Sequence, residues 1–191
     1  MSNENQEEIA TILEQTEKLD FLIQSLVKLS RMESGIIAVH SEDTTIKQML
    51  ESIQQQFNVK VREKNITLSL CDTDLHVRCD SKWTVEALGN IVDNAIKYTA
   101  CGGNVQIKVE QYSFFVKIDI IDDGIGIEKE EIPKIFGRFY RSLSVADQPG
   151  VGIGLFLARE IIQAQKGYIK VTSKRGKGST FSVFLPIAKK E

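Results

Sequence analysis

One stretch, DSKWTVEALGNIVDNAIKYT from Asp80 to Thr99, constrains the fold of this chain more than any other segment. At about 3.6 residues per turn it forms an amphipathic helix with two well-separated faces. The apolar face suits packing on a sheet, and it consists of Val85, Leu88, Ile91, Val92, Ala95 and Ile96. The opposite face carries, at steps of four, four and three residues, Glu86, Asn90, Asn94 and Lys97.

The composition of this polar face indicates a ligand rather than plain solvent. Asparagine inside a helix costs roughly half a kcal/mol relative to alanine, and this face carries two of them one turn apart. A solvated face is built more favourably from Glu, Lys or Gln. Two stacked amides and a lysine suit a charged, oxygen-rich ligand with its counter-ion. The alternative is an ordinary amphipathic helix whose polar side faces water.

The composition narrows the class of protein. Of 191 residues, 42% are hydrophobic and 26% charged, which is typical of a soluble globular domain with an appendage. The formal net charge of −2 gives no attraction to nucleic acid, so we expect no nucleic-acid partner. Cys71, Cys79 and Cys101 lack the spacing of zinc ligands or of a disulfide framework. The sequence has no signal peptide and no apolar run near the ~18 residues of a membrane span, so we expect a cytoplasmic chain.

The segment before the Asp80 helix predicts a long N-terminal helix followed by mixed structure. Apolar residues recur at three- and four-residue steps between Asn5 and Glu33, and Gly35 is a natural C-terminal cap. This apolar stripe needs another helix or another subunit as its partner. The elements expected next are a β-rich segment at 36–40, capping residues at 41–43, a helix at 45–62, and strands at 66–71 and 75–79.

The segment after the Asp80 helix predicts two hairpins, a long loop and one more helix. Residues 128–132 form at most a short helical turn, because Pro133 interrupts them. The stretch 136–150 is long enough for a functional or mobile loop. The other expected elements are strands at 105–111 and 114–121, a helix at 151–166, and strands at 168–173 and 180–187. Strand pairs interleaved with helices predict an α/β fold, a two-layer sandwich of one mixed β-sheet covered on one face by helices.

Three glycine-rich segments stand at the ends of expected elements. DDGIGI at 122–127 follows a strand, and its first Asp can accept a hydrogen bond from an exocyclic amine such as that of adenine. GVGIGL at 150–155 leads into a helix, whose N-terminal amides form an anion site. GKGST at 176–180 fits a hairpin turn. Taken singly, the first two segments have alternatives as well, namely an Asp-Gly turn and a flexible hinge.

The order of these motifs resembles the ATP-binding domain shared by bacterial sensor histidine kinases, DNA gyrase, the Hsp90 chaperones and MutL. The details are most similar to the histidine kinases: NIVDNAIKYT resembles their Asn box, DDGIGI their first glycine box, IFGRFYR their Phe box, and GVGIGL and GKGSTFSVFLP their later glycine boxes. The resemblance covers roughly Ile36 to Pro186 and implies a Bergerat-type ATP-binding fold. It divides the chain into a helix at 1–35, similar to the second dimerisation and phosphotransfer helix, and a catalytic ATP-binding domain at 36–191.

The resemblance implies a role for each matching residue at the phosphate end of ATP. Asn94, helped by Asn90, would supply amide oxygen to Mg²⁺, and Glu86 would orient Asn90 or face solvent. Lys97 would meet phosphate charge. Either of two lid residues, Arg138 or Arg141, would close on the phosphates. The triphosphate would take backbone amides from Gly150, Gly152, Gly154 and Leu155. The implied catalytic residues are Asn90, Lys97 and Arg141.

The resemblance also implies how the nucleoside is bound. Asp122 would accept a hydrogen bond from the adenine amine, and Thr180 would support Asp122, through a water if needed. Tyr98 would lie beside the nucleoside. The adenine pocket would be shaped by Gly124, Gly126 and Ile127.

A histidine kinase also needs an acceptor histidine, and this chain has only His40 and His76. Neither is followed by the family's pattern of an acidic residue and, four positions on, a proline. The resemblance therefore implies transfer from Mg-ATP to a histidine-bearing helix of the same kinase that lies outside this sequence. It further implies a homodimer in the complete protein and a response regulator as partner.

Two rival functions stay open from the sequence. One is a hydrolysing ATPase of the gyrase and Hsp90 kind, which places a general-base Glu where this chain has Asn90. An amide cannot take that proton, so hydrolysis should be slow. The other is a non-catalytic ATP-binding module that docks on a partner kinase.

Overall fold

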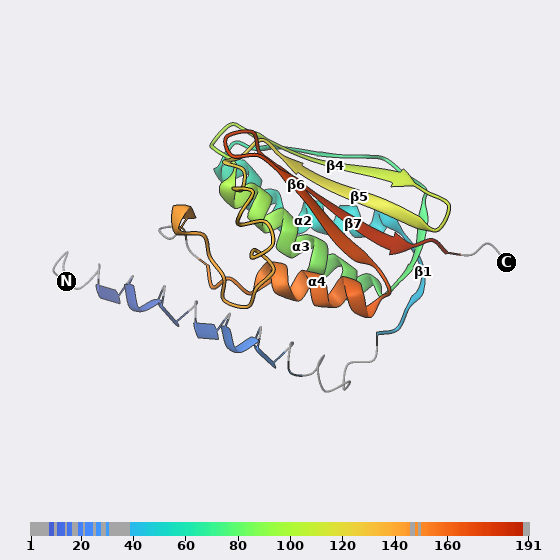
Figure 1. Ribbon diagram of the computed structural model, residues 1–191, viewed down its shortest axis with the longest axis horizontal. Coiled ribbons are helices and arrows are strands. Elements are labelled where there is room, and N and C mark those ends of the chain that lie inside the picture. Colours follow the sequence, from blue (N-terminus) through green and yellow to red (C-terminus); the bar gives the residue numbers. More distant parts are fainter. Residues whose placement is uncertain are drawn as a thin grey trace.

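The computed structural model (Figure 1) describes residues 39–145, 148 and 150–188, together with scattered residues between 8 and 30. The described residues between 8 and 30 are all helical, as the apolar periodicity predicts. The expected cap at Gly35 and residues 36–38 of the expected β-rich segment lie outside the described residues. Residues 39 and 40 of that segment have no regular structure.

Five strands form the main sheet in the order β2-β4-β5-β7-β6 (Figure 1). β2 runs parallel to β4, whereas the other neighbours are antiparallel, so the sheet is mixed as predicted. The two predicted hairpins are present, β4 with β5 and β6 with β7. The strand bounds are β2 Thr67–Leu70, β4 Asn104–Gln111, β5 Phe115–Asp122, β6 Tyr168–Ser173 and β7 Ser179–Pro186.

β1 (Glu42–Thr45) and β3 (His76–Cys79) form a separate antiparallel ribbon. β2 and β3 follow one another in the chain but belong to different sheets. β2 pairs in parallel with β4, and a parallel pair needs a crossover connection, which here contains β3 and α3. The prediction that residues 41–43 cap a helix is wrong, since Glu42 and Asp43 pair with β3. The helix begins after Thr45, whose side chain makes no capping hydrogen bond to the described residues.

Three helices cover one face of the main sheet (Figure 1): α2 (Ile46–Glu63), α3 (Ser81–Tyr98) and α4 (Gly154–Ala164). α3 packs against both α2 and α4. Its predicted apolar face is buried, with Leu88, Ile91 and Val92 at 0% exposure, and it joins the core formed with the inner face of the sheet. The predicted two-layer architecture is therefore confirmed.

α4 is shorter than the helix predicted at 151–166. Gly152 has a φ of 78° and Lys166 a φ of 61°, which are left-handed values that the interior of an α-helix excludes. The helix therefore spans only Gly154–Ala164. Residues 151–153 are loop backbone in front of its first turn, with Gly152 at a left-handed φ and Ile153 in the right-handed helical region.

α3 is fixed at both ends. The side chain of Asp80 accepts a hydrogen bond from the Trp83 backbone N at 3.2 Å, as an N-cap does. At the other end, Lys64 Nζ donates to three carbonyl oxygens of the C-terminal turn at 2.7–2.9 Å. The ammonium group satisfies carbonyls that the helix leaves open and complements the helix dipole. The turn that carries Lys97 and Tyr98 is thereby held in place.

The segment between β5 and α4 contains little regular structure, as the sequence predicts. Residues 129–136 form turns rather than a helix, and a short 3₁₀ helix, η1, spans Leu143–Val145. Within the described part of the chain, no helix is both long and apolar enough to cross a membrane.

Candidate functional site

A cavity of about 190 Å³ lies between the C-terminal half of α3, the end of β5, the start of α4 and the loop before it. We call the described residues of that loop from 138 to 145, together with 148 and 150, the lid. Most of the residues singled out from the sequence meet at this cavity, although they come from segments far apart in the chain. Those that line it are Asn90, Asn94, Lys97, Tyr98, Asp122, Gly126, Ile127, Arg141, Gly150, Gly152, Gly154 and Leu155.

Three of the predicted site residues are not among those that line the cavity. Gly124 lies directly behind it and donates its backbone N–H to Asp122. Arg138 is exposed, with its guanidinium 4.7 Å from the centre of the Phe156 ring on α4. Thr180 belongs to β7, where successive side chains point to opposite faces, and its neighbour Ser179 lines the cavity instead. The prediction that Thr180 supports Asp122 stays a prediction, and the contact to Asp122 that the structure shows comes from the Ser179 backbone N.

Asp122 forms the acidic end of the cavity. Its Oδ1 accepts the backbone N–H of Gly124 at 2.9 Å and that of Ser179 at 3.2 Å. The carboxyl group is only 8% exposed, and burial raises its pKa despite these two hydrogen bonds. Because both bonds engage Oδ1, Oδ2 is the oxygen with capacity for a donor from a ligand.

Two cations, Lys97 and Arg141, also line the cavity. Burial lowers the pKa of Lys97, and the positive charge of Arg141 lowers it further. Lys97 Nζ lies 5.0 Å from the centre of the Tyr98 ring. The Arg141 guanidinium donates to the carbonyl oxygen of Val145 at 2.8 Å and to that of Gln148, so it also holds the lid together. A site that brings two like charges together attracts an anion.

The start of α4 adds neutral donors at this cationic end. Its N-cap, Ile153, has no side chain that can accept from the first-turn amides. The positive end of the helix dipole is therefore available to a negatively charged ligand. Gly152 is required just before it, because a Cβ there would lie 2.6 Å from the carbonyl oxygen of Tyr140 on a backbone with positive φ. The close approach of the lid to this segment thus depends on glycine.

The two asparagines of α3 both line the cavity. Asn90 Nδ2 donates to the backbone carbonyl oxygen of Glu86 at 3.0 Å, which fixes the orientation of the amide. Asn90 Oδ1 faces α4, since a Cβ placed on Gly154 would lie 2.9 Å from it. Asn94 lines the cavity one turn further along. The backbone of Glu86 thus takes part in orienting Asn90.

Sequence reasoning missed several residues that line the cavity. Asp93 precedes Asn94 and forms an ion pair with Lys60 of α2 at 2.5 Å. The period of α3 places it beside the polar face, so the helical pattern contained a signal for it. The lid contributes residues that carried no local signal, because a loop has no period from which direction can be read. The missed lining residues are Asp93, Ile125, Glu131, Ile135, Tyr140, Ser142, Ser144, Val145, Val151, Ser179 and Phe181.

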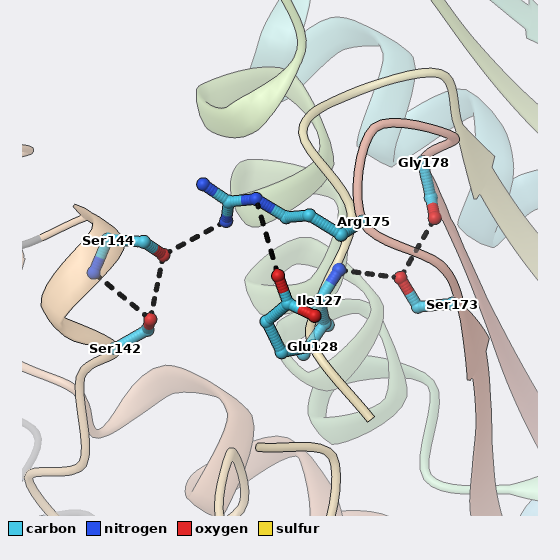
Figure 2. Close-up of polar contacts among 7 residues, drawn as sticks. All are labelled: Ile127, Glu128, Ser142, Ser144, Ser173, Arg175 and Gly178. Atoms are coloured by element: carbon cyan, nitrogen blue, oxygen red, sulfur yellow. Dashed lines mark hydrogen bonds and ion pairs between the residues drawn. The ribbon is translucent and has the colours of Figure 1, made fainter. Parts of the chain in front are cut away.

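The glycine loop after β5 and the turn between β6 and β7 form one hydrogen-bonded unit beside the cavity (Figure 2). The Ile127 backbone N donates to Ser173 Oγ at 2.8 Å, and this hydroxyl donates to the Gly178 carbonyl oxygen at 2.8 Å. The Gly176 backbone N donates to the Ile125 carbonyl oxygen at 2.8 Å. The GKGST segment is thus a hairpin turn, as predicted, and it also supports the loop that shapes the Asp122 end.

Comparison with known proteins agrees with this geometry. Residues 79–189 match the family model described as histidine kinase-, DNA gyrase B-, and HSP90-like ATPase. The sensor histidine kinase WalK of Bacillus subtilis (strain 168) is 34% identical over 177 residues, which are 90% of this chain and 29% of WalK. The chain spans about a third of the length of the curated relatives it matches.

Solved structures agree as well. The mycobacterial sensor histidine kinase MprB is 26% identical with a TM-score of 0.68, and the match covers 77% of this chain and 97% of that one. The histidine kinase ThkA, solved in complex with the response regulator protein TrrA, has a TM-score of 0.80 at 22% identity over 98% of this chain and 53% of that one. The second likeness shows the fold alone.

Proposed function

The chain belongs to the family of histidine kinase-, DNA gyrase B- and HSP90-like ATPases, and from that premise we propose that it is the ATP-binding catalytic part of a sensor histidine kinase. Such a part holds ATP so that its γ-phosphoryl group reaches a histidine on a separate helix. Phosphoryl transfer of this kind depends on positioning and on stabilisation of charge.

One observation carries the proposal: the cavity is lined both by a buried carboxylate, Asp122, and by the cations Lys97 and Arg141, groups that suit the two ends of ATP. Asp122 presents a buried acceptor at one end, which suits the exocyclic amine of adenine. Lys97, Arg141 and the uncapped start of α4 form a cationic and amide-rich end, which suits a triphosphate. A ligand with an amine at one end and a negative charge at the other satisfies both.

The donor set at the phosphate end fits Mg²⁺. Asn90 and Asn94 offer amide oxygens, and this ion prefers oxygen ligands shared with substrate phosphates and water. Asn90 is oriented for this by its hydrogen bond to the Glu86 carbonyl, which leaves Oδ1 facing α4. When bound, the ion would neutralise charge on the phosphates. Lys97 and Arg141 would hold the phosphate oxygens, and Gly150, Gly152, Gly154 and Leu155 would offer backbone amides.

The nucleoside end follows from the same assignment. Asp122 would read the base, with Gly124, Gly126 and Ile127 shaping the pocket and Tyr98 beside the sugar. We assign support of Asp122 to Ser179, whose backbone donates to it. Arg138 lies on Phe156 outside the cavity, so Arg141 is the better candidate for the phosphate-closing arginine.

The rival hydrolytic function is disfavoured by the chemistry of residue 90. An amide that already donates to the Glu86 carbonyl has no basic lone pair with which to activate water. We therefore propose that the γ-phosphoryl group is transferred to an acceptor rather than rapidly hydrolysed.

The complete kinase would surround this part with further components. We propose that residues 1–35 act as the second helix of a dimerisation and phosphotransfer domain, and that residues 36–191 are the catalytic domain. The partners would then be the histidine-bearing helix of the same kinase, a second copy of the chain, and a response regulator, the kind of partner with which ThkA was solved. Because ATP is a cytoplasmic metabolite, this part would work in the cytoplasm.

Calorimetric titration with ATP, with and without Mg²⁺, tests the proposal. We expect saturable binding that Mg²⁺ strengthens, and an Asn94→Ala variant that binds at least roughly tenfold more weakly, a loss of about 1.4 kcal/mol. Asn58→Ala, which removes an exposed amide from α2, is the matched control and should bind as the unaltered chain does. Unchanged affinity in Asn94→Ala would contradict the metal and phosphate assignment.

A further inference from the structure

Arg175 lies in the turn between β6 and β7, and its side chain reaches the lid (Figure 2). Its guanidinium Nη1 donates to Ser144 Oγ at 3.0 Å, across 31 positions of sequence. Its Nε lies 3.9 Å from Glu128 Oε1, an ion pair that orients the guanidinium. One side chain therefore joins the lid to the unit that supports the Asp122 end of the cavity.

The partner of Arg175 belongs to a folded part of the lid. Ser144 Oγ lies 2.8 Å from Ser142 Oγ, and the Ser144 backbone N donates to that same oxygen at 3.2 Å. The Val145 backbone N donates to the Ser142 carbonyl oxygen at 3.1 Å. Ser142, Ser144 and Val145 all line the cavity. A contact to Ser144 therefore acts on the whole of η1 and on one wall of the cavity.

The other side of this contact is anchored. The turn that carries Arg175 is tied to the glycine loop through Gly176 and Ser173. It also belongs to the hairpin of β6 and β7, in which β6 is paired along its full length. Of the two sides joined by Arg175, the hairpin is thus the fixed side and the lid is the side that can move.

The contact between Arg175 and Ser144 bears on ligand entry because the cavity is small. About 190 Å³ is less than the ~300–1,000 Å³ usual for small-molecule sites. The lid forms one wall of this small cavity, so we infer that it moves outward when a nucleotide enters or leaves. Any contact that holds η1 against the fixed hairpin must then be broken when a ligand enters or leaves.

We propose that Arg175 is a latch that holds the lid over the cavity and sets the rates of nucleotide binding and release. The inference rests on the proposed function and extends it to the kinetics of exchange. The latch acts by being broken during opening, so it slows association and dissociation together. Arg175 is a positioning residue here and does not touch the ligand.

Stopped-flow mixing with a fluorescent ATP analogue tests the latch. In Arg175→Ala we expect the association and dissociation rate constants both to rise roughly fivefold, with a smaller change in Kd. Fivefold is about the factor by which the loss of one net hydrogen bond shifts an opening equilibrium. Ser144→Ala should act in the same direction, and the double variant should add little, because both remove one contact. Lys177→Ala removes a cation from the same turn and should leave the rates unchanged.

Three results of this experiment would overturn the latch. The first is unchanged rates in Arg175→Ala. The second is an equal rise of the rates in Lys177→Ala, which would show an effect of positive charge in general. The third is a rise in the dissociation rate alone, which would mean that Arg175 contacts the nucleotide.

Hydrogen exchange in the nucleotide-free chain separates the latch from the proposed function. The amides of Val145 and Gln148, which donate within the lid, should exchange roughly fivefold faster in Arg175→Ala and in Ser144→Ala than in the unaltered chain. Failure of the unaltered chain to bind ATP would refute the proposed function but not this result. Equal exchange in all variants would refute the latch even if ATP binds.

Discussion

At the scale of single residues, both ends of the cavity hold a charge that the empty protein disfavours. Burial raises the pKa of Asp122 and lowers that of Lys97, so in each case the fold disfavours the ionised form. A ligand that offers an amine to the carboxylate and a phosphate to the ammonium would relieve both. The binding site therefore lowers the stability of the empty protein, a frequent trade in functional sites.

The first prediction concerns Asp122→Asn. The amide oxygen can still accept the two backbone N–H groups, and the cost of a buried charge disappears. We expect the free energy of unfolding of the ligand-free variant to be about 0.5–2 kcal/mol higher than that of the unaltered chain at neutral pH, as measured by thermal or urea denaturation. Because the folded-state pKa is raised, the ionised form costs stability only above the unfolded pKa of about 3.9, and the gain should shrink as the pH falls below it.

The neighbouring Asp123 is the matched control for this prediction. Hydrogen bonds from Asn104 lower the pKa of Asp123, so its ionised form contributes stability above the unfolded pKa. Asp123→Asn should therefore shift stability at neutral pH in the opposite direction. ATP affinity should fall in Asp122→Asn, whose amide nitrogen donates where the carboxylate accepts. A destabilised Asp122→Asn protein would contradict the prediction.

The second prediction concerns the pH dependence of ATP affinity. Burial and Arg141 lower the pKa of Lys97, so Lys97 loses its proton at a lower pH than an exposed lysine does. Affinity for ATP, measured by calorimetry, should fall as the pH rises from about 7 toward about 10. Lys97→Arg keeps its charge throughout this range and should flatten the profile. An equal fall in both proteins would show that another group is responsible.

At the scale of elements, α3 is the part on which the site depends most. It contributes Asn90, Asn94 and Lys97 along one face and much of the core along the other. Its ends are set by neighbours: Asp80 caps the start, and Lys64 satisfies the last carbonyls from the end of α2. The direction in which the site residues point thus depends on contacts outside the site.

The third prediction compares two lysines near the end of α2. Lys64→Met leaves three carbonyl oxygens of α3 without their donor and should cost about 1–3 kcal/mol of unfolding free energy. Lys60→Met removes an exposed ion pair with Asp93 and should cost at most about 1 kcal/mol. Urea denaturation of the two variants provides the measurement. Equal losses would mean that the cap of α3 contributes no more than a surface ion pair.

At the scale of the whole molecule, the nucleotide cavity and the two histidines lie in different places. The cavity is bounded by helices, one end of the sheet and the lid. His76 is on β3 of the small ribbon, 2.5 Å from Asp43, and the backbone of His40 bonds to the cap residue Asp80. Neither histidine lines the cavity, which the described residues enclose without them. The proposed acceptor must therefore come from another part of the kinase.

The fourth prediction is that the 191-residue polypeptide alone binds ATP but does not phosphorylate itself. Transfer needs an acceptor held in line with the γ-phosphate. With labelled ATP the polypeptide should stay unlabelled. A version joined to a histidine-bearing helix should acquire acid-labile label, and the Asn94→Ala version of the same fusion should not. Strong labelling of the polypeptide alone at His40 or His76 would contradict this prediction.

The sequence by itself determined the elements whose signals are local. The helical period of the apolar residues between 80 and 99 predicted α3 and its two faces, because the spacing of apolar residues shows which face is buried. Alternation and turn glycines placed both hairpins, and the order of the glycine segments indicated the family. Most of the candidate site followed, since Asn90, Asn94, Lys97 and Asp122 stand on or beside such elements.

Only the tertiary structure decided the features that depend on contacts between distant segments. Which of Ser179 and Thr180 faces the cavity depends on the register of β7 against β5, and a shift of one residue reverses the faces of a strand. The separation of β2 from β3 depends on a partner strand that follows α3. The contact of Arg175 with Ser144 joins a hairpin turn to a loop that has no period of its own. Local sequence patterns carry no information on such pairings, because the free energy that selects them is gained only when the whole sheet and its helices pack together.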